Sequence, residues 1–250
     1  MTLRIAVVYE ASADFVTATE LADRAIVEAI DWLDDEAVIH HRIWLPEVPT
    51  GPLTWKNLKR MARDANIRSH GKFYGESGLP DAVATRRAID FLMSTGHPFD
   101  GIVLIRDQDD QPERRGGLEQ ARLQTHHRVE IVIGLAVVER ENWVVCGFDH
   151  QNDAEFARLE AERTRLGFDP CSGSHRLTDS KADNAAHSPK RVLKELTGDD
   201  PDRERRCWRE TILETLRRRG SENGLAAFLF EVRNRLASLF GYVARSNGER

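Results

Sequence analysis

Short apolar runs alternate with segments of helical periodicity along the first half of the chain. Residues 4–9 read RIAVVY, and residues 18–33 then place Ala, Leu and Ile at helical spacing. A weaker apolar run covers residues 38–44, and stronger ones cover 101–105 and 129–138. Such runs, separated by helical segments, indicate buried strands joined by helices. The pattern predicts an α/β fold with a mostly parallel four-stranded sheet and flanking helices.

Residues 45–80 interrupt this pattern. They are rich in Pro, Gly and polar residues and contain PEVPTGP and HGKFYGESGLP, which are typical of turns. We expect an insertion exposed to solvent, with one short helix near residues 55–64. Its role stays open at this stage. Beyond it, helices are predicted at residues 81–95 and from about residue 113.

No convincing strand follows Glu139. Helical periodicity predicts helices at 153–166, 189–196, 203–218 and 221–240, and in the last of these Leu and Phe line one face. The chain is therefore expected to consist of an α/β domain, residues 1–140 with the insertion at about 45–80, and a mainly helical C-terminal region, residues 141–250.

Composition narrows the class of protein. The 250 residues are 40% apolar and contain no apolar run long enough to span a membrane, so we expect a soluble protein without a membrane partner. No signal segment is evident, which predicts a cytoplasmic location, and three scattered cysteines suit reduced thiols. A net charge of −5 argues against coating nucleic acid by bulk charge. Local basic clusters exist at 114–115, 203–206 and 217–219, and such clusters are most often salt-bridged helix surfaces.

Acidic residues follow two of the predicted strands. Glu10 ends the first, with Asp14 soon after, and Asp107, Asp109 and Asp110 end the third. In open parallel sheets, function collects at the carboxyl ends of the strands. Alternation along an extended backbone would place Asp107 and Asp109 on the same side. Because clustered carboxylates repel one another, a divalent cation such as Mg²⁺ or Mn²⁺ is the expected counter-charge.

These residues resemble the Toprim domain of topoisomerases, primases and small nucleases. In that pattern a strand ends in Glu, a small residue and a later acid follow, and another strand ends in Asp-x-Asp. Glu10, Asp14, Asp107 and Asp109 match it, over about residues 3–139. Ala11 departs from it, since Toprim domains usually have glycine there.

The whole chain is also similar to a bacterial family of Toprim-like proteins often associated with phage defence. That likeness rests on Glu141-Asn142-Trp143 after the fourth strand and on Pro189-Lys190 before a helix, and it extends to about residue 200.

The resemblance implies a divalent-metal-dependent nuclease or phosphodiesterase that cleaves DNA or RNA as an anti-phage effector. Glu10 would be a metal ligand or the general base, and Asp107 and Asp109 would be ligands. Asp110 would be a second-metal or outer acid, although it equally suits a turn before a proline. Asp14 would be an outer partner of the metal or, equally, the N-cap of the first helix.

Further charged residues are expected to bind phosphate or to support the metal. The planar guanidinium group of arginine can bind phosphate through paired hydrogen bonds. Two glutamates after the fourth strand could complete a second metal position, and a later lysine could reach the phosphate. The plainer alternatives are a solvated helix surface for Arg114 and Arg115, an exposed position at a helix start for Lys190, and a helix start for Glu141. These residues are Arg106, Arg114, Arg115, Glu139, Glu141 and Lys190.

A zinc site is a weaker candidate. Cys146 and His150 are spaced like Cys171 and His175, so a site with two cysteines and two histidines is conceivable. Neither pair has the usual second cysteine close by in sequence. Single buried cysteines and surface histidines explain the pattern without a metal.

Motifs of other catalytic classes are missing from the sequence. It contains no Gly-x-Ser-x-Gly elbow, no Walker loop and no Gly-x-Gly-x-x-Gly after the first strand. An ATPase acting with this protein would therefore be a separate chain. The main alternative is a non-catalytic Toprim-like subunit that binds metal and docks such an ATPase or a sensor subunit. A phosphotransfer receiver fits less well, because its first strand usually ends in an acid pair, whereas here the first strand ends in the single acid Glu10. The sequence leaves open whether the protein forms a homo-oligomer.

Overall fold

A four-stranded sheet forms the centre of the computed structural model, which describes residues 2–125 and 129–241. The strand order is β2-β1-β7-β8, and every neighbouring pair is parallel. This arrangement confirms the predicted α/β fold, and it brings the carboxyl ends of the strands to one edge of the sheet. The strands are β1 (Leu3–Val8), β2 (Arg42–Leu45), β7 (Gly101–Asp107) and β8 (Glu130–Ala136).

Both faces of the sheet are apolar, as expected for a parallel sheet that is covered on two sides. In β7, Val103 and Ile105 belong to one buried cluster, whereas Ile102 and Leu104 belong to the other. The alternation of side chains along the strand thus divides the core into two layers.

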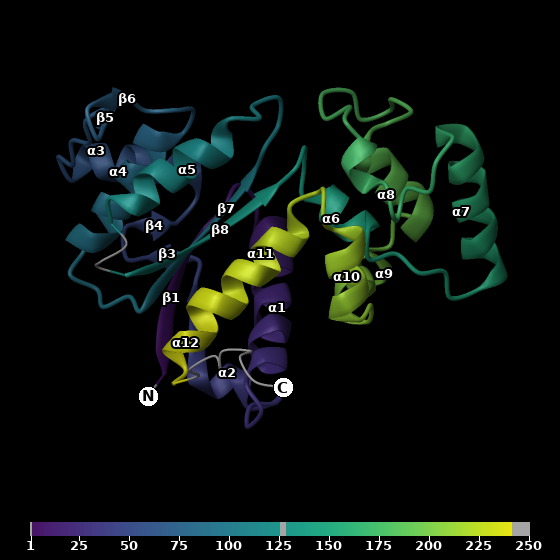
Figure 1. The fold of residues 1–250 in the computed structure, drawn as a ribbon, viewed down its shortest axis with the longest axis horizontal. Helices are drawn as coiled ribbons and strands as arrows, with labels where there is room; N and C mark the ends of the chain where they lie inside the picture. The colour runs from purple at the N-terminus through teal and green to yellow at the C-terminus, as the bar shows by residue number, and fades with distance from the viewer. Residues whose placement is uncertain (1, 126–128, 242–250) are drawn as a thin grey trace, which may run out of the picture.

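Helices from distant parts of the chain cover each face (Figure 1). The last helices of the described chain lie beside α1 on one face, and the helices of the middle of the chain cover the other. The first set is α1 (Ser12–Ala29), α11 (Leu225–Glu231), a π-helical segment (Val232–Leu236) and α12 (Ala237–Leu239); the second is α3 (Trp55–Asp64), α4 (Ala82–Ser94) and α5 (Arg114–Leu123).

The second predicted strand is only half correct. Residues 38–41 form a short helix, α2 (Val38–His41), and the strand begins at Arg42. The Asp34 side chain accepts a hydrogen bond from the Ala37 backbone N–H at 2.7 Å, which favours a helical turn. Ile39 is 54% exposed, so extending the strand would bury little.

The segment predicted as an exposed insertion contributes to the core. The short helix expected near residues 55–64 is confirmed as α3. Leu53, Leu58 and Phe73 are buried against the face of the sheet that α4 also covers. Two small hairpins complete the segment: β3 (Glu47–Val48) with β4 (Gly51–Pro52), and β5 (Lys72–Phe73) with β6 (Glu76–Ser77).

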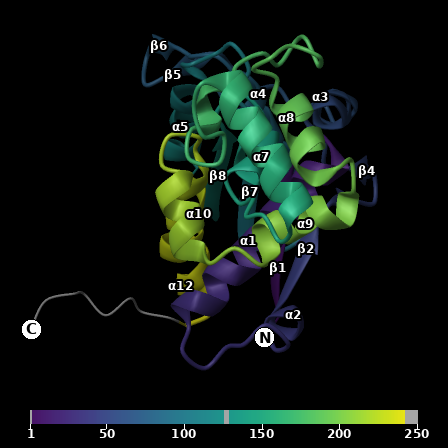
Figure 2. The same ribbon diagram turned by 90° about the vertical axis from the view of Figure 1, so that its right-hand side faces the viewer.

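Beyond β8 the described chain is helical, as predicted, and Figure 2 faces this part. The expected helix 203–218 is two helices, because Thr211 lies between them and its hydroxyl donates to the Gly147 carbonyl at 2.6 Å. The elements are α6 (Glu141–Val145), α7 (Asp153–Leu166), a 3₁₀ turn (Ser174–Arg176), α8 (Pro189–Thr197), α9 (Pro201–Arg209) and α10 (Leu213–Arg219).

The predicted helix 221–240 begins only at Leu225. Gly224 has φ of 90°, and a side chain there would meet the Leu135 carbonyl oxygen at 2.1 Å. Glycine therefore lets the chain pass close to the end of β8 before the helix starts. Residues 242–250, the end of the predicted helical region, lie outside the described residues.

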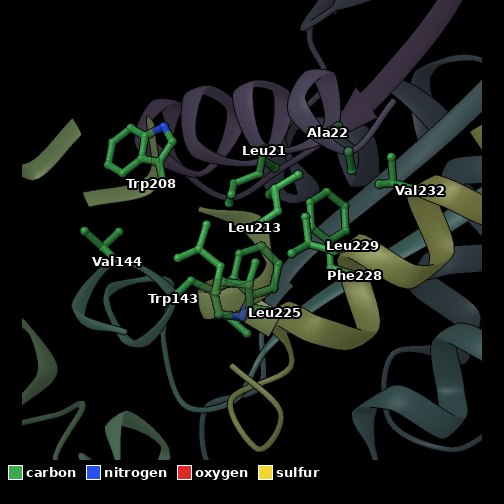
Figure 3. Packing of buried hydrophobic residues seen from close by; sticks show 14 of the residues in the cluster. Leu21, Ala22, Trp143, Val144, Trp208, Leu213, Leu225, Phe228, Leu229 and Val232 are labelled. Carbon is green, nitrogen blue, oxygen red and sulfur yellow. The ribbon is translucent and has the colours of Figure 1, made fainter. Parts of the chain in front are cut away.

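One buried cluster joins the helical region to the sheet (Figure 3). Trp143 of α6 stacks on Phe228 of α11 with ring centroids 5.2 Å apart. Its indole N–H donates to the Asn223 carbonyl at 2.9 Å. Within the described ranges, no helix is both long and apolar enough to cross a membrane.

Candidate functional site

Acidic residues follow three neighbouring strands at the same edge of the sheet. Glu10 comes shortly after β1, Asp107 is the last residue of β7, and Glu139 comes shortly after β8. The pairs Val8–Leu104 and Asp107–Ala136 set the strands side by side at this edge. The structure thus brings together acids that are far apart in sequence.

The segment around Glu10 is held on both sides. The Tyr9 N–H donates to the Leu53 carbonyl at 3.2 Å, and the Trp55 N–H donates to the Tyr9 carbonyl at 3.1 Å. These bonds attach the start of α3 to the end of β1. Ala11 has φ of −128° and ψ of 161°, an extended conformation that needs no glycine.

Asp14 is not the N-cap of α1, which is Ala11, but its side chain supports the same helix start. Its carboxylate accepts a hydrogen bond from the Ala11 N–H at 2.7 Å and so stabilises the start of α1. Its other oxygen lies 3.7 Å from Nε of Arg140. Burial raises the pKa of Asp14, while the Ala11 hydrogen bond and Arg140 lower it.

Asp107 is the most strongly perturbed acid of the group. One carboxylate oxygen accepts a hydrogen bond from the Arg140 backbone N–H at 2.9 Å. Burial, together with the charges of Asp14, Glu10 and Glu141, raises its pKa to about 8. Burial also raises the pKa of Glu10, with Arg106 acting in the opposite direction. The four acids therefore form one electrostatically coupled cluster.

Glu139 extends this cluster toward α8. One of its oxygens accepts a hydrogen bond from the Lys190 ammonium at 2.9 Å, and the other, Oε2, is buried and has no hydrogen-bond partner among the described residues. Burial raises the pKa of Glu139, and Glu141 and Asp109 act in the same direction. Val138, directly before it, has φ of 67°, which is costly for a β-branched residue.

Arg106 and Arg114 lie on the other side of Glu10 and share an acid that sequence reasoning missed. Oδ2 of Asp81 is 2.8 Å from Nε of Arg106 and 2.5 Å from Nε of Arg114. Arg106 Nε also lies 3.5 Å from Glu10. Asp81 precedes α4 with φ of 64°, and in the sequence it signals only a helix start.

The expected alternation of Asp107 and Asp109 does not hold. The strand ends at Asp107, and Asp109 has φ of 49°, so the backbone has already left the extended conformation. The Asp109 carboxylate pairs with Arg114 at 2.8 Å. Its charge still raises the pKa values of Glu10 and Glu139, which places it at the margin of the cluster.

Arg140 is a second residue that sequence reasoning missed. Its side chain is buried, 3.2 Å from Glu141 and 2.8 Å from Glu204 of α9. The signal in the sequence was an arginine between two acids directly after a strand. Arg140, Glu141, Lys190 and Glu204 also line a pocket of about 250 Å³ beside the cluster.

Two of the predicted site residues lie elsewhere. Asp110 pairs with Lys181, and both side chains are largely exposed. Arg115 lies 2.9 Å from Glu119 and 3.1 Å from Glu231 of α11, and it has no ion pair with any acid of the cluster. The remaining predicted residues, Glu10, Asp14, Arg106, Asp107, Asp109, Arg114, Glu139, Glu141 and Lys190, are brought together.

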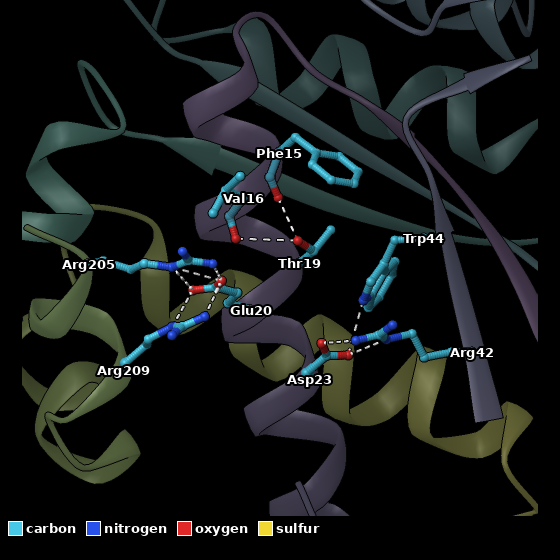
Figure 4. A network of polar contacts seen from close by, with 9 residues as sticks. All are labelled: Phe15, Val16, Thr19, Glu20, Asp23, Arg42, Trp44, Arg205 and Arg209. Atoms are coloured by element: carbon cyan, nitrogen blue, oxygen red, sulfur yellow. Dashed lines mark hydrogen bonds and ion pairs between the residues drawn. The ribbon is translucent and has the colours of Figure 1, made fainter. Parts of the chain in front are cut away.

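The C-terminal basic clusters are mostly ion-paired within the molecule, as the sequence favoured. Arg205 and Arg209 both bind Glu20 of α1 (Figure 4). Arg203 is buried and binds Glu155 at 2.7 Å. Arginines 217 and 219 also have acidic partners, so these side chains hold helices together.

The cysteine and histidine pairs have separate surroundings. Cys146 is buried and contacts the Trp143 carbonyl at 3.0 Å, whereas His150 packs on Phe156. Cys171 is buried, and His175 lies 3.1 Å from Glu222. Among residues 2–125 and 129–241, no group of three or more His, Cys, Asp or Glu side chains is arranged to hold a metal ion.

Fold and site together define an α/β protein with a parallel sheet and a coupled acidic cluster at the carboxyl edge of that sheet. Comparison with known families found no matching family model, and neither the curated proteins nor the solved structures include a match.

Proposed function

We propose that the protein is a divalent-metal-dependent phosphodiesterase, a nuclease acting on DNA or RNA, with its active site at this acidic cluster. The observation that carries the proposal is geometric. Glu10, Asp107 and Glu139 lie at the ends of three adjacent parallel strands, and Glu139 Oε2 is buried there without a hydrogen-bond partner among the residues that the structure describes. The likeness of the sequence to Toprim domains and to a defence-associated family supports the same activity and suggests an anti-phage role.

The donor set suits Mg²⁺ or Mn²⁺, which prefer carboxylate oxygen. Because no three such side chains of the described residues are already arranged to hold a metal, Glu10, Asp107 and Glu139 would have to turn from their present partners to hold the ion. When bound, such an ion supplies positive charge for a phosphoryl oxygen and lowers the pKa of a coordinated water.

The side chains of this protein would complete the site around the phosphate. Arg106 presents a planar guanidinium next to Glu10, where it would orient a phosphate through paired hydrogen bonds. Lys190 is 46% exposed and lies beside Glu139, so it would bind the phosphate from the opposite side. Arg140 holds Asp107 in place through its backbone N–H.

A second candidate, a non-catalytic subunit that docks a partner such as an ATPase, is favoured by one observation. The clustered acids already have partners within the protein: the Arg106 guanidinium lies 3.5 Å from Glu10, the Arg140 N–H donates to Asp107, and Lys190 donates to Glu139. In that case the cluster would be a structural site neutralised by the chain itself.

A cleavage assay separates the two candidates. Plasmid DNA, single-stranded DNA and RNA would be incubated with Mg²⁺ or Mn²⁺ and with wild type, Glu10→Ala, Asp107→Ala or Asp31→Ala. We expect cleavage by wild type and a loss of at least about 100-fold in both cluster variants, because a metal ligand is removed. Asp31 is exposed just after α1 and serves as the matched control.

Absence of cleavage on every substrate would favour the non-catalytic subunit. Cleavage that survives both cluster substitutions would show that the active site lies elsewhere in the molecule.

A further inference from the structure

A strongly basic groove lies on the face of the sheet opposite α1. It has a volume of about 690 Å³ and is lined by α3, the loop that follows α3 and one residue of α4. No Asp or Glu is among its lining residues, although the chain has a net charge of −5. The cations that line it are Lys56, Lys59, Arg60, Arg63, Arg68 and Arg87.

The cations of α3 form one stripe along the helix. Lys56, Lys59, Arg60 and Arg63 recur at helical spacing and are all exposed, while Leu58 and its neighbours face the core. Like charges at this spacing repel one another and destabilise a helix. The stripe is therefore better explained by an external anion than by the stability of α3.

These cations differ from the other basic clusters in their pairing. Arg63 lies 3.3 Å from the exposed Asp64, but within the described chain the other five groove cations form no ion pair. Arginines 203, 205, 209, 217 and 219, in contrast, are bound to acids of the same molecule. Among the described residues, the groove is thus a concentration of positive charge that is left available to a ligand.

The groove continues toward the acidic cluster. A second hollow, of about 260 Å³, shares Lys56, Lys59 and Arg87 with it and reaches Trp55 and Arg106. The Arg106 guanidinium lies over the Trp55 ring, 4.8 Å from its centroid. Its Nε is 3.5 Å from Glu10, so positive side chains follow one another from the groove to the candidate site.

We infer that this groove binds the sugar–phosphate backbone of a nucleic acid strand and leads that strand to the acidic cluster. A positively charged groove can follow the phosphates of a strand, and Trp55 adds an aromatic surface beside it. The path to the cluster rests on the proposed function, whereas binding in the groove does not require catalysis.

Binding without metal tests the inference. Fluorescent oligonucleotides of roughly 20 nucleotides, as single-stranded DNA, single-stranded RNA or duplex, would be titrated in EDTA at several salt concentrations. The groove variant is Lys59→Glu with Arg60→Glu. The matched control is Arg218→Glu with Arg233→Glu, two exposed arginines that form no ion pair within the described ranges.

We expect the groove variant to bind at least about 10-fold more weakly, because phosphate contacts are lost. The slope of log Kd against log salt should fall by about 1.4 for a single strand or about 1.8 for a duplex, which also identifies the preferred form. The control, with the same change in net charge, should bind within about 2-fold of wild type. Circular dichroism melting would establish that both variants are folded.

Equal weakening by groove and control variants would overturn the inference, since bulk charge would then explain binding. Competition by poly-glutamate as effective as that by nucleic acid would also overturn it, in favour of an acidic protein partner. If the groove variant weakens binding but the wild type cleaves no substrate, only the proposed catalytic function is wrong. If the groove variant binds and cleaves nucleic acid as well as wild type does, only the inference about the groove is wrong.

Discussion

Asp107 illustrates how a single carboxyl group depends on its surroundings. It is partly buried at the end of β7, and the charges of Asp14, Glu10 and Glu141 add to the effect of burial, so that its pKa rises to about 8. The single hydrogen bond from the Arg140 N–H opposes this shift only in part. Without a cation, the carboxyl group therefore keeps its proton near neutral pH.

The raised pKa of Asp107 makes the free energy of unfolding depend on pH. Between about pH 4 and about pH 8, the folded state binds a proton at Asp107 that the unfolded state has released, so stability falls as pH rises. This contribution reaches up to about 1.4 kcal/mol per pH unit. Asp107→Asn should remove it, and the free energy of unfolding in EDTA at about pH 5 and about pH 7 would measure the difference.

In that experiment, the wild type should lose more stability than Asp107→Asn between the two pH values. Parallel losses would mean that Asp107 does not titrate in this range.

At the scale of elements, α1 is the helix through which the sheet and the helical region are joined. Glu20 accepts hydrogen bonds from Arg205 and Arg209 of α9 (Figure 4). It also accepts one from the Trp208 indole of the same helix. Asp23, on the same helix, accepts from Arg42 at 2.7 Å and so ties α1 to β2. Polar contacts thus attach α1 to elements on two sides.

Glu20 shows a pH dependence opposite to that of Asp107. Burial alone would raise its pKa, but its hydrogen bonds to Arg209, Arg205 and Trp208 outweigh it and lower the pKa to about 2. Its stabilisation is therefore present above about pH 4.5 and is lost as pH falls toward about 2. Glu20→Ala should cost about 1–3 kcal/mol at neutral pH, after allowance for solvent screening.

Urea unfolding at neutral pH and at about pH 3 would test this prediction, because the difference between wild type and variant should shrink in acid. Glu36→Ala, which changes an exposed acid without an ion pair among the described residues, is the control. A deficit of equal size at both pH values would indicate lost packing instead of a lost ion pair.

At the scale of the whole molecule, one core extends across the predicted boundary at residue 140. Phe228, Leu229 and Val232 belong to the same buried cluster as Val7 of β1 and Val132 of β8. Asn223 strengthens this connection, since its amide donates to the Asn142 carbonyl at 2.8 Å and to the Ser174 hydroxyl at 2.9 Å. One face of the sheet is therefore completed by residues near the end of the described chain.

A chain ended at residue 140 should accordingly fail to fold on its own. The face of the sheet that α11 covers would be exposed, and a contiguous apolar surface of that kind favours aggregation or a loosely packed state. Thermal melting and binding of a hydrophobic dye would measure this. A cooperative melt without dye binding would instead establish residues 1–140 as an independent domain.

Much of the fold could be predicted because it depends on local patterns. The apolar runs ending at Glu10 and Asp107 lie as strands, and α3 begins and ends where its periodicity indicated. Asp107 and Glu10 could be selected because parallel strands end at one edge, whatever the details of packing. Residues 38–41 were misassigned because a side-chain hydrogen bond from Asp34 favours a helical turn over a marginal edge strand.

The sequence by itself thus determined most of the elements, the class of fold and the acids at the ends of β1 and β7, since burial and backbone periodicity act over short distances. Only the tertiary structure decided which charges meet. Asp81 pairs with Arg106 and Arg114, Arg140 lies within the cluster, and Arg115 pairs with Glu231. These pairings could not be read from the sequence, because contacts between distant segments depend on how the helices pack. The same packing left Lys56, Lys59 and Arg60 of α3 without ion pairs among the described residues and aligned them in one groove leading toward Glu10.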